Sequence, residues 1–321
     1  MSEMTVNQAI GEAIAEEMRR DQRVVIFGEG VATKRQDLVA EFGDRRVRNT
    51  PLAEAIIAGA AAGAAATGLR PIIDLLFVPF ICYSMDQIVN SAGKLRYISG
   101  GQFSFPMVVM ALTGSGWTVG AQHNHNLESW FVHAPGLKVV MPSTADDFKG
   151  LLKASIRDDN PVLFFTDMVL GYEGGEVPGG DHVVPLGQAR VRRQGDDLTI
   201  VSYAKTVHTS LKAAEELAAK GISAEVIDLR SLKPLDEATI LASARKTGRV
   251  IVVHEASRMC GVGAEVAAIV AEQAFASLKA PVIRVTGPDA PPPSSYALEQ
   301  AFIPQPARIV AAAEQMMVAL A

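Results

Sequence analysis

Short apolar runs alternate with helix-like segments along almost the whole chain. The predicted strands are residues 24–28, 71–78, 106–112, 137–142, 161–165, 198–202, 224–229, 249–254 and 282–285. Strands that alternate with helices pair in parallel, because each helix carries the chain back across its sheet. The pattern therefore predicts an α/β fold with doubly wound, mainly parallel sheets.

The predicted helices have recognisable ends. The first begins at a capping box formed by Thr5 and Gln8, and apolar residues then recur every four positions along one face, at Val6, Ile10, Ile14 and Met18. Further helices are predicted at 207–219, from about 236 to Gly248, and at 262–276.

One segment interrupts the alternation. Residues 172–187 concentrate glycine, proline and acidic residues, which is the composition of a connection. We therefore predict two domains, 1–175 and 188–321, joined by a linker at 176–187. The length of 321 residues suits two domains of ordinary size.

Composition narrows the classes of partner. The chain is 49% hydrophobic and 20% charged, with a formal net charge of −5. The negative charge and the lack of any Lys/Arg run argue against nucleic acid and anionic membranes. The alanine- and glycine-rich uncharged run, 55–69, is shorter than the ~20 residues that span a bilayer. With no signal-peptide pattern at the start, we expect a cytoplasmic protein that binds small molecules and other proteins.

Glu54 begins an alanine- and glycine-rich helix. Gly59 and Gly63 leave one face of this helix almost without side chains, so another backbone could pack closely against it. The Glu54 carboxylate either interacts with the dipole of its own helix or is a partly desolvated group that handles protons. A glutamate in a first turn is a common helix-start signal, so spacing alone favours the first interpretation.

A histidine-containing loop follows the third predicted strand. His123 and His125 lie in this glycine-rich loop, and His133 comes soon after. Metal binding is disfavoured, because no carboxylate or thiol stands nearby at a metal-site spacing. A catalytic or substrate-binding imidazole fits a loop at a strand end, since histidine exchanges a proton near neutral pH. A hydrogen-bonded histidine beneath the loop is the structural alternative.

Several common catalytic signatures are missing. The chain has no Walker A sequence, no complete GxGxxG fingerprint and no GxSxG elbow, so it shows no phosphate cradle of its own. Cys82 and Cys260 form no CxxC pair, and we expect two buried free thiols.

Several motifs, in order along the chain, resemble those of one family. They are NTPLAE at 49–54, DQIVNSAGK at 86–94, QH at 122–123, WFVHAPGLKVVMP at 130–142, RDDNP at 157–161, EVIDLRSLKPLD at 225–236, KTGR at 246–249 and HEA at 254–256. The chain resembles the β subunits of thiamine-diphosphate-dependent 2-oxo acid dehydrogenase E1 components, a group that includes pyruvate, branched-chain 2-oxo acid and acetoin dehydrogenases. The resemblance implies a pyrimidine-binding domain followed by a transketolase C-terminal-like domain.

The resemblance also implies that this chain is half of an enzyme. In the family, the α subunit holds the diphosphate through Mg²⁺, and the β subunit holds the aminopyrimidine. We therefore expect an α2β2 heterotetramer that is active only with its α subunit. The implied reaction is decarboxylation of a 2-oxo acid, or cleavage of acetoin, followed by transfer of the acyl group to a lipoyl-bearing E2 component.

Residue roles follow from the same resemblance. Glu54 matches the carboxyl that hydrogen-bonds N1′ of the pyrimidine and promotes proton removal from the thiazolium C2, a task that suits a carboxyl of raised pKa. Phe80 matches the aromatic residue against the pyrimidine ring, and Glu29 matches an acidic residue near the thiamine. His123 matches a histidine that assists acyl transfer, where the departing lipoyl sulfur needs a proton donor.

A potassium site is implied at the loop before Pro161. Its side chains would be Asp158 and Asn160, with backbone around Val108 and Ser155, and a plain turn is the alternative. The chain departs from the family at His123-Asn124-His125, where relatives usually read His-Ser-Gln, and in a shorter loop after Glu29. These departures leave the substrate open.

Two other functions remain compatible with the sequence. One is the C-terminal half of a split transketolase-like enzyme, which transfers a ketol unit and needs no lipoyl partner. The other is a non-catalytic assembly subunit that docks on an E2 core. The segments 130–142 and 157–161 favour the dehydrogenase over the first, and the presence of Glu54 and His123 argues against the second.

Overall fold

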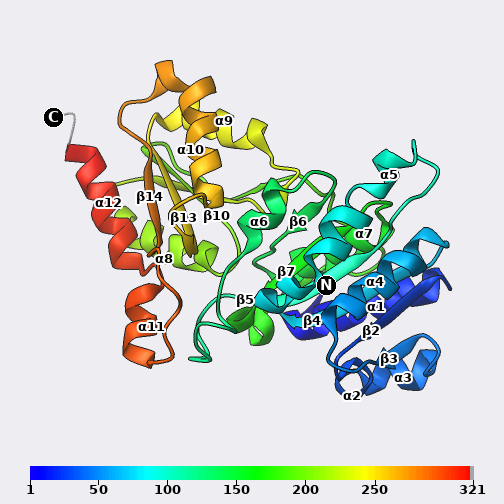
Figure 1. Cartoon of the computed structure of the whole chain (residues 1–321). Coiled ribbons are helices and arrows are strands. Elements are labelled where there is room, and N and C mark those ends of the chain that lie inside the picture. Colours follow the sequence, from blue (N-terminus) through cyan, green and yellow to red (C-terminus); the bar gives the residue numbers. More distant parts are fainter. Residues whose placement is uncertain (319–321) are drawn as a thin grey trace. The chain divides into compact units, whose positions relative to one another are not determined.

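The computed structural model describes residues 1–318, which divide into two compact units (Figure 1). The first unit comprises residues 1–113, 130–140 and 144–186. The second comprises residues 114–129, 141–143 and the chain from 187 onwards. The sequence predicts a single boundary between two domains, at the linker 176–187. The units are instead discontinuous in sequence, because residues 114–129 and 141–143 pack with the second unit.

The first unit is built on a parallel sheet. Its strands lie side by side in the order β6 (Lys138–Val140), β7 (Val162–Asp167), β5 (Val108–Thr113), β4 (Arg70–Phe77), β2 (Val24–Gly28) and β3 (Val47–Asn49). Every pairing among them is parallel. The buried apolar residues of β5 and β7 agree with strands that are covered on both faces.

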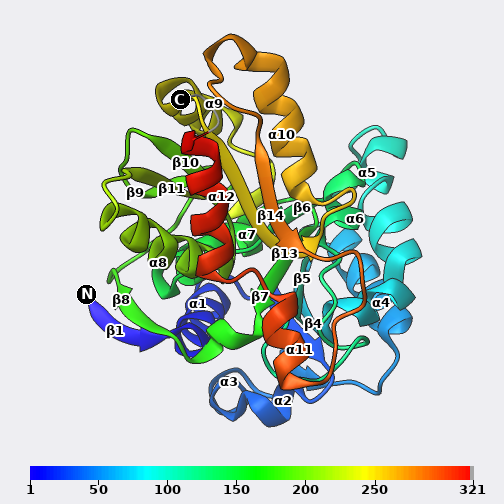
Figure 2. The same cartoon turned by 90° about the vertical axis from the view of Figure 1, so that its left-hand side faces the viewer.

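Helices surround this sheet and are visible in two views (Figures 1 and 2). They are α1 (Val6–Arg20), α2 (Val31–Lys34), α3 (Gln36–Phe42), α4 (Glu54–Ala66), η1 (Val78–Ser84), η2 (Asp86–Ala92), α5 (Leu95–Ile98), α6 (Glu128–His133), α7 (Ala145–Arg157) and η3 (Met168–Tyr172). The predicted capping box is present, since the Thr5 side chain accepts from Gln8 N and the Gln8 side chain accepts from Thr5 N. The segment 86–92 is π-helical rather than α-helical.

A small antiparallel sheet closes the first unit. Strand β1 (Ser2–Thr5) pairs with β8 (Gly174–Val177), from Ser2 opposite Val177 to Thr5 opposite Gly174. Part of the predicted connection is therefore a strand. The sequence conceals it because glycine-rich β8 pairs through its backbone and shows no alternation of side chains.

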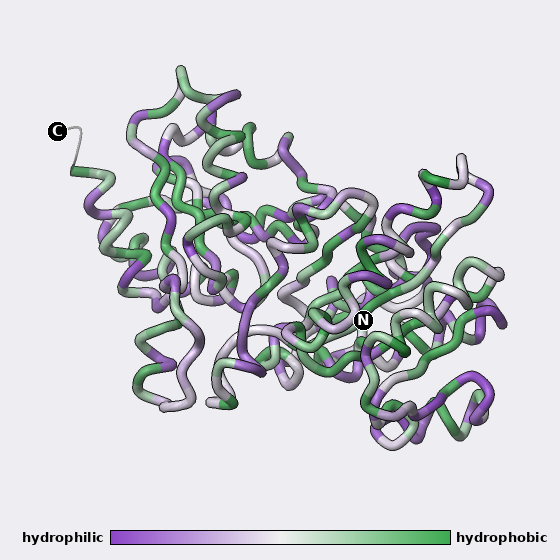
Figure 3. The backbone as a smooth tube through the Cα atoms, in the orientation of Figure 1, coloured by the Kyte–Doolittle hydropathy of each residue, from purple (hydrophilic) through white to green (hydrophobic). Residues whose placement is uncertain are grey.

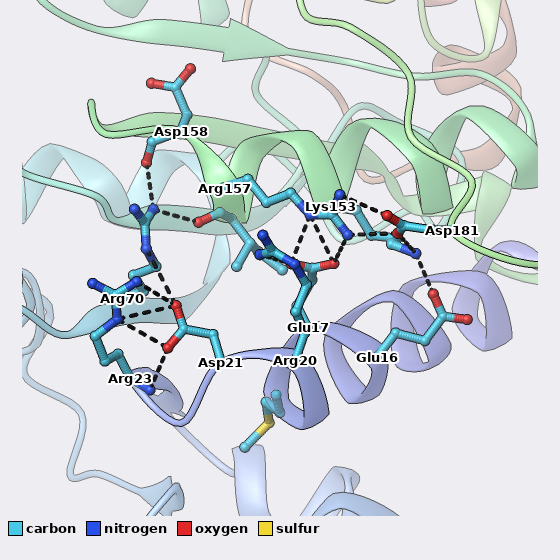
Figure 4. Close-up of polar contacts among 12 residues, drawn as sticks. Glu16, Glu17, Arg20, Asp21, Arg23, Arg70, Lys153, Arg157, Asp158 and Asp181 are labelled. Atoms are coloured by element: carbon cyan, nitrogen blue, oxygen red, sulfur yellow. Dashed lines mark hydrogen bonds and ion pairs between the residues drawn. The ribbon is translucent and has the colours of Figure 1, made fainter.

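An ion network joins α1 to α7 in the first unit (Figure 4). Glu17, only 1% exposed, accepts from Arg157 Nε at 3.0 Å and from Arg157 Nη2 at 2.6 Å. Arg157 also binds the exposed carboxylate of Asp181 at 2.6 Å, and Lys153 lies 2.8 Å from the same carboxylate. These bonds hold the pKa of Asp181 well below its usual range and raise that of Arg157.

The second unit carries its own sheet. Its strand order is β14 (Ile283–Gly287), β13 (Val250–Ser257), β10 (Leu198–Ser202), β11 (Ala224–Asp228) and β9 (Arg190–Arg193), with only the β9–β11 pairing antiparallel. The other elements of this unit are β12 (Ser231–Lys233), α8 (Thr206–Ala218), α9 (Glu237–Thr247), α10 (Val262–Gln273), η4 (Phe275–Ser277), α11 (Tyr296–Phe302) and α12 (Pro306–Val318). Two mainly parallel, doubly wound domains confirm the predicted fold class.

Each unit has an apolar core beneath its helices. In the first unit the core joins α1, α7 and the sheet strands, and in the second it joins α8, α12 and β10, β11 and β13. Hydrophobic and hydrophilic segments alternate along the backbone in Figure 3. No helix within residues 1–318 is long and apolar enough to span a bilayer.

The expectation of two buried thiols is wrong in part. Cys82 and Cys260 are free, but both are exposed. Cys82 lies on the short segment η1, and Cys260 lies in the turn before α10 with φ +54°. Neither residue occupies a core-facing position of a strand or long helix, which composition alone could not reveal.

Candidate active site

Strands β2, β3 and β4 end at the same edge of the first sheet. Gly28, the last residue of β2, is paired with Asn49 of β3 and with Asp74 of β4. A Cβ atom on Gly28 would lie 2.3 Å from the Asp74 carbonyl oxygen, so only glycine allows this close pairing. The residues that follow these parallel strands therefore meet at the carboxyl edge, where open α/β sheets bind ligands.

Glu54 lies at this edge as the first residue of α4 and is half-buried. Helix α4 has no side-chain cap, and within residues 1–318 no hydrogen bond or ion pair engages the Glu54 carboxylate. The helix packs on β4, η1 and η2, and Gly59 approaches Gln87. Glu54 thus has the position of a helix-start residue while its carboxylate remains available to a ligand.

Phe80 reaches the same edge from the end of β4. A β-bulge between Asp74 and Phe77 interrupts the β4–β5 pairing, and Leu76 within it has φ +61°. Phe80 then packs edge-to-face on Phe77, with ring centroids 5.7 Å apart. Bulges often redirect side chains beside functional sites, and this one immediately precedes the aromatic pair.

Glu29 follows β2 directly and is half-buried. Gly30, with φ +64°, turns the chain into α2. The Asn49 side chain secures that turn by accepting from Ala32 N at 2.7 Å. The structure therefore brings Glu29, Glu54 and Phe80 to one sheet edge.

The predicted potassium residues lie at the opposite edge, where β5 and β7 begin. The Asp158 carboxylate accepts from Asn160 N at 2.9 Å and pairs with Lys138, and this pairing lowers the Asp158 pKa although burial opposes it. Asn160 Oδ1 accepts from Arg96 at 2.8 Å. An ion bound to these side-chain oxygens would have to displace Lys138 or Arg96, so the turn needs no ion and the potassium site stays a prediction.

The backbone near this turn is equally engaged. The Ser155 carbonyl accepts from Asp158 N at 3.3 Å, and Val108 is paired with Val162. Arg96 and Asn160 also line a cavity of about 510 Å³. Since this cavity shares no residue with the Glu29, Glu54 and Phe80 edge, it does not belong to the candidate active site.

His123 belongs to the second unit, in the loop 114–129. His123 is half-buried, and its backbone N donates to the Gly120 carbonyl at 3.2 Å. Burial lowers the pKa of the neighbouring His125. Within residues 1–318 no group of three or more His, Cys, Asp or Glu side chains could hold a metal ion.

Three side chains that the sequence does not mark as functional anchor this loop. Ser115 N donates to buried Glu255 at 2.5 Å, and Lys205 donates to the Ser115 carbonyl and pairs with Glu255. Glu299 of α11 binds the next part of the loop. These residues are far apart in sequence, and although Glu255 lies in the HEA motif, Lys205 and Glu299 lie in none of the motifs named above, so only the fold shows that they act together.

A second buried polar group lies in the second unit, which includes Glu128, the first residue of α6. Tyr203 donates to Glu128 Oε1 at 2.7 Å and stacks on His254 with ring centroids 5.8 Å apart. Burial raises the pKa of Glu128 to about 6 and lowers that of His254 to about 4. Both side chains are therefore predominantly neutral between these two pH values.

Comparison with known proteins first defines a class. Residues 2–170 match the family model of the transketolase pyrimidine-binding domain, and residues 187–309 match that of the transketolase C-terminal domain. A solved split-gene transketolase, described as an inactive β4 tetramer, superposes with a TM-score of 0.82 at 26% identity, covering 99% of both chains. The fold is that of the transketolase class, and its pyrimidine-binding domain implies dependence on thiamine diphosphate.

Curated relatives then define the family. The chain is 45% identical to the pyruvate dehydrogenase E1 component subunit beta of Rhizobium meliloti, over 97% of this chain and 69% of that protein. It is 44% identical to the acetoin:2,6-dichlorophenolindophenol oxidoreductase subunit beta of Cupriavidus necator, over 98% and 97% of the two chains. It is equally similar, at 44%, to the 2-oxoisovalerate dehydrogenase subunit beta of Bacillus subtilis, over 98% and 99%.

The chain belongs to the family of β subunits of 2-oxo acid and acetoin dehydrogenase E1 components, which are oxidoreductases. The family predicted from the ordered sequence motifs is confirmed.

Proposed function

We propose that this chain supplies the pyrimidine half of a thiamine-diphosphate site in a heteromeric E1 component. With an α subunit, it decarboxylates a 2-oxo acid or cleaves acetoin and passes the acyl group to a lipoyl-bearing E2 component. The observation that carries this proposal is the Glu54 carboxylate. Among the described residues 1–318 it has no hydrogen-bond or ion-pair partner, and it lies at the carboxyl edge of the pyrimidine-binding domain, where the strands that precede Glu29 and Phe80 end.

The residues at this edge fit the cofactor's aminopyrimidine. Glu54 would hold a proton at its carboxyl and share it with the ring nitrogen N1′. Phe80, supported edge-on by Phe77, offers an aromatic surface to a flat ring. When bound, thiamine diphosphate supplies the carbon nucleophile and the electron sink for decarboxylation. The protein's contribution is to orient the ring and keep water from the Glu54 carboxyl.

Mg²⁺ and the diphosphate belong, in this proposal, to the α subunit. The sequence contains no Walker A or complete GxGxxG motif, and residues 1–318 contain no cluster of three or more His, Cys, Asp or Glu side chains suited to a metal. A complete site therefore requires a second chain.

Helix α4 offers a surface for such a chain. Ile56, Ala60 and Gly63 are exposed along one face, Ile56 to 73%. Apart from the neighbouring backbone of α4 itself, no atom of the described part of the chain lies within 4 Å of the position that a Cβ of Gly63 would take. A partner backbone can approach this face closely and would further bury the adjacent Glu54. We propose an α2β2 assembly in which subunit contacts cover this face.

His123 would serve the second half of the reaction. Its imidazole would donate a proton to the lipoyl sulfur that departs when the acyl group transfers. This step needs a group that is protonated and deprotonated near neutral pH, which suits histidine.

The direct test is reduction of an artificial electron-accepting dye. The chain is assayed with and without its α subunit, in the presence of thiamine diphosphate and Mg²⁺, against pyruvate, branched 2-oxo acids, 2-oxoglutarate and acetoin. Activity only in the mixture supports the proposal and identifies the substrate. Activity of the chain alone, or inactivity of the assembled mixture with all these substrates, contradicts it.

The structural similarity to a split transketolase favours one alternative, a ketol transferase. The sequence relatives weigh against it, because those at 44–45% identity are dehydrogenase subunits. A lipoyl domain separates the two functions. Acylation of that domain supports the dehydrogenase, whereas transfer of a ketol unit between sugar phosphates without acylation supports the alternative.

A further inference from the structure

A buried carboxylate of α11 holds the loop that carries His123. Glu299 is 0% exposed. Its Oε1 accepts from Gly116 N at 2.9 Å, from Thr118 N at 3.1 Å and from the Asn124 side-chain amide at 2.9 Å. Asn124 directly follows His123, so one oxygen ties the start of the loop to the residue beside the histidine.

The loop backbone is shaped to converge on this oxygen. Gly116 and Thr118 have φ values of +137° and +54°, and such conformations allow neighbouring N–H groups to point at one anion. A carboxylate buried in this way is costly without hydrogen bonds, and bonds to a charged acceptor are the stronger kind. The conformation of residues 116–118 and the burial of Glu299 therefore depend on each other.

A short backbone turn connects the segment held by Glu299 to His123. The Gly120 carbonyl accepts from His123 N at 3.2 Å and from Asn124 N at 3.1 Å. His123 thus sits between a backbone turn on one side and the Asn124–Glu299 bond on the other. Ser115 is fixed separately by Glu255 and Lys205, whereas Glu299 binds the part of the loop nearer the histidine.

We propose that Glu299 is a positioning residue for acyl transfer. It fixes the loop 116–124 in the conformation that presents the His123 imidazole to the lipoyl group. Glu299 acts through Asn124 and the loop backbone rather than by touching the substrate. This inference rests on the proposed role of His123.

Two substitutions separate the hydrogen bonds of Glu299 from its volume. Glu299→Met keeps the length of the side chain and removes the acceptor. Glu299→Gln keeps an oxygen for the three donors, and its amide can replace Oε2, which has no hydrogen-bond partner among residues 1–318. The matched controls are Glu314→Met and Glu314→Gln, at an exposed glutamate of α12 in the same unit.

Amide hydrogen exchange of the assembled α–β complex tests the anchor without reference to activity. Gly116 and Thr118 are half-buried, so their freed amides can reach water while the rest of the unit stays folded. Glu299→Met should lower protection of these two amides by about tenfold or more, with α8 and α10 unchanged. Glu299→Gln should retain more of the protection. Equal protection of Gly116 and Thr118 in wild type and Glu299→Met would overturn the proposal.

Kinetics then test the positioning role. The complex is supplied with thiamine diphosphate, Mg²⁺, the substrate that the dye-reduction assay identifies, and an isolated lipoyl domain. Under these conditions Glu299→Met should impair lipoyl acylation about as much as His123→Ala, with little change in dye reduction. The double variant should be no slower than His123→Ala alone, because both changes remove the same function. Equal loss of both activities, or multiplied losses in the double variant, would show a general structural role instead.

The two proposals can fail separately. A wild-type complex that acylates no lipoyl domain contradicts the proposed function, and hydrogen exchange still decides whether Glu299 holds the loop. A wild-type complex that acylates normally, together with a Glu299→Met variant that does so equally well, contradicts only the positioning role.

Discussion

Replacing Arg157 by methionine should destabilise the first unit strongly. The substitution keeps an apolar stem and removes the guanidinium that binds Glu17 at 2.6 Å. Glu17 is 1% exposed, and its remaining cation, Arg20, lies 3.4 Å away on the surface. Removing one partner of a buried ion pair typically costs about 3–5 kcal/mol, because the other charge stays buried.

The structure supplies a matched comparison. Asp181 binds the same guanidinium at 2.6 Å but is 64% exposed, so water replaces the lost contact. Asp181→Asn should therefore cost no more than about 1 kcal/mol. The double variant Glu17→Leu/Arg157→Met should regain most of the loss of the Arg157→Met single variant, since two apolar side chains leave no buried charge.

Urea unfolding at pH 7 measures these differences. The two units need not unfold together, so hydrogen exchange of peptides from α1 and α7 should accompany circular dichroism. Equal losses in Arg157→Met and Asp181→Asn, or a double variant less stable than either of its single variants, would refute the argument that burial sets the cost.

Three further variants test the chemistry and the buried groups. Glu54→Gln should leave folding and α binding intact and lower dye reduction by about 10²–10⁴-fold, because a proton-handling group is lost; unchanged turnover would remove Glu54 from the mechanism. His123→Ala should impair lipoyl acylation more than dye reduction, and equal losses would move its role to an earlier step. Glu128→Gln should be more stable than wild type at pH 7.5 by about 2 kcal/mol, and similar to it at pH 4. The sign follows from burial, which raises the folded pKa of Glu128 from 4.5 to about 6, so wild-type stability falls as pH rises through that window. Urea titrations at both pH values would contradict this if the two proteins responded alike.

Local signals made much of the fold predictable. Helix α9 illustrates this, since Asp236 caps it by accepting from Thr239 N at 3.0 Å and Gly248 ends it with φ +72°. The apolar strands were also located closely, and β10 has the predicted bounds. Such signals succeed because they depend on residues within a few positions of one another.

Long-range arrangements were not predictable. The sequence predicts neither α11 nor α12, which follow a proline run, and it predicts a connection where the structure has β8. Nothing in the local sequence distinguishes Glu299, which is buried, from the many glutamates that are exposed. The candidate site divides in the same way, because the resemblance of local motifs to a known family indicated Glu29 and Phe80, whereas the anchors of the His123 loop are determined by tertiary packing.

The discontinuity of the second unit affects how this chain can be dissected. A fragment starting at residue 188 would omit residues 114–129, whose backbone amides bind Glu255 and Glu299. In the isolated fragment the carboxylates of Glu255 and Glu299 would lose these hydrogen bonds, and the fragment would be prone to misfold. When the C-terminal region is expressed by itself, for binding assays or crystallisation, residues 114–129 should therefore be fused to it through a linker. Truncation at residue 188 alone would not be sufficient.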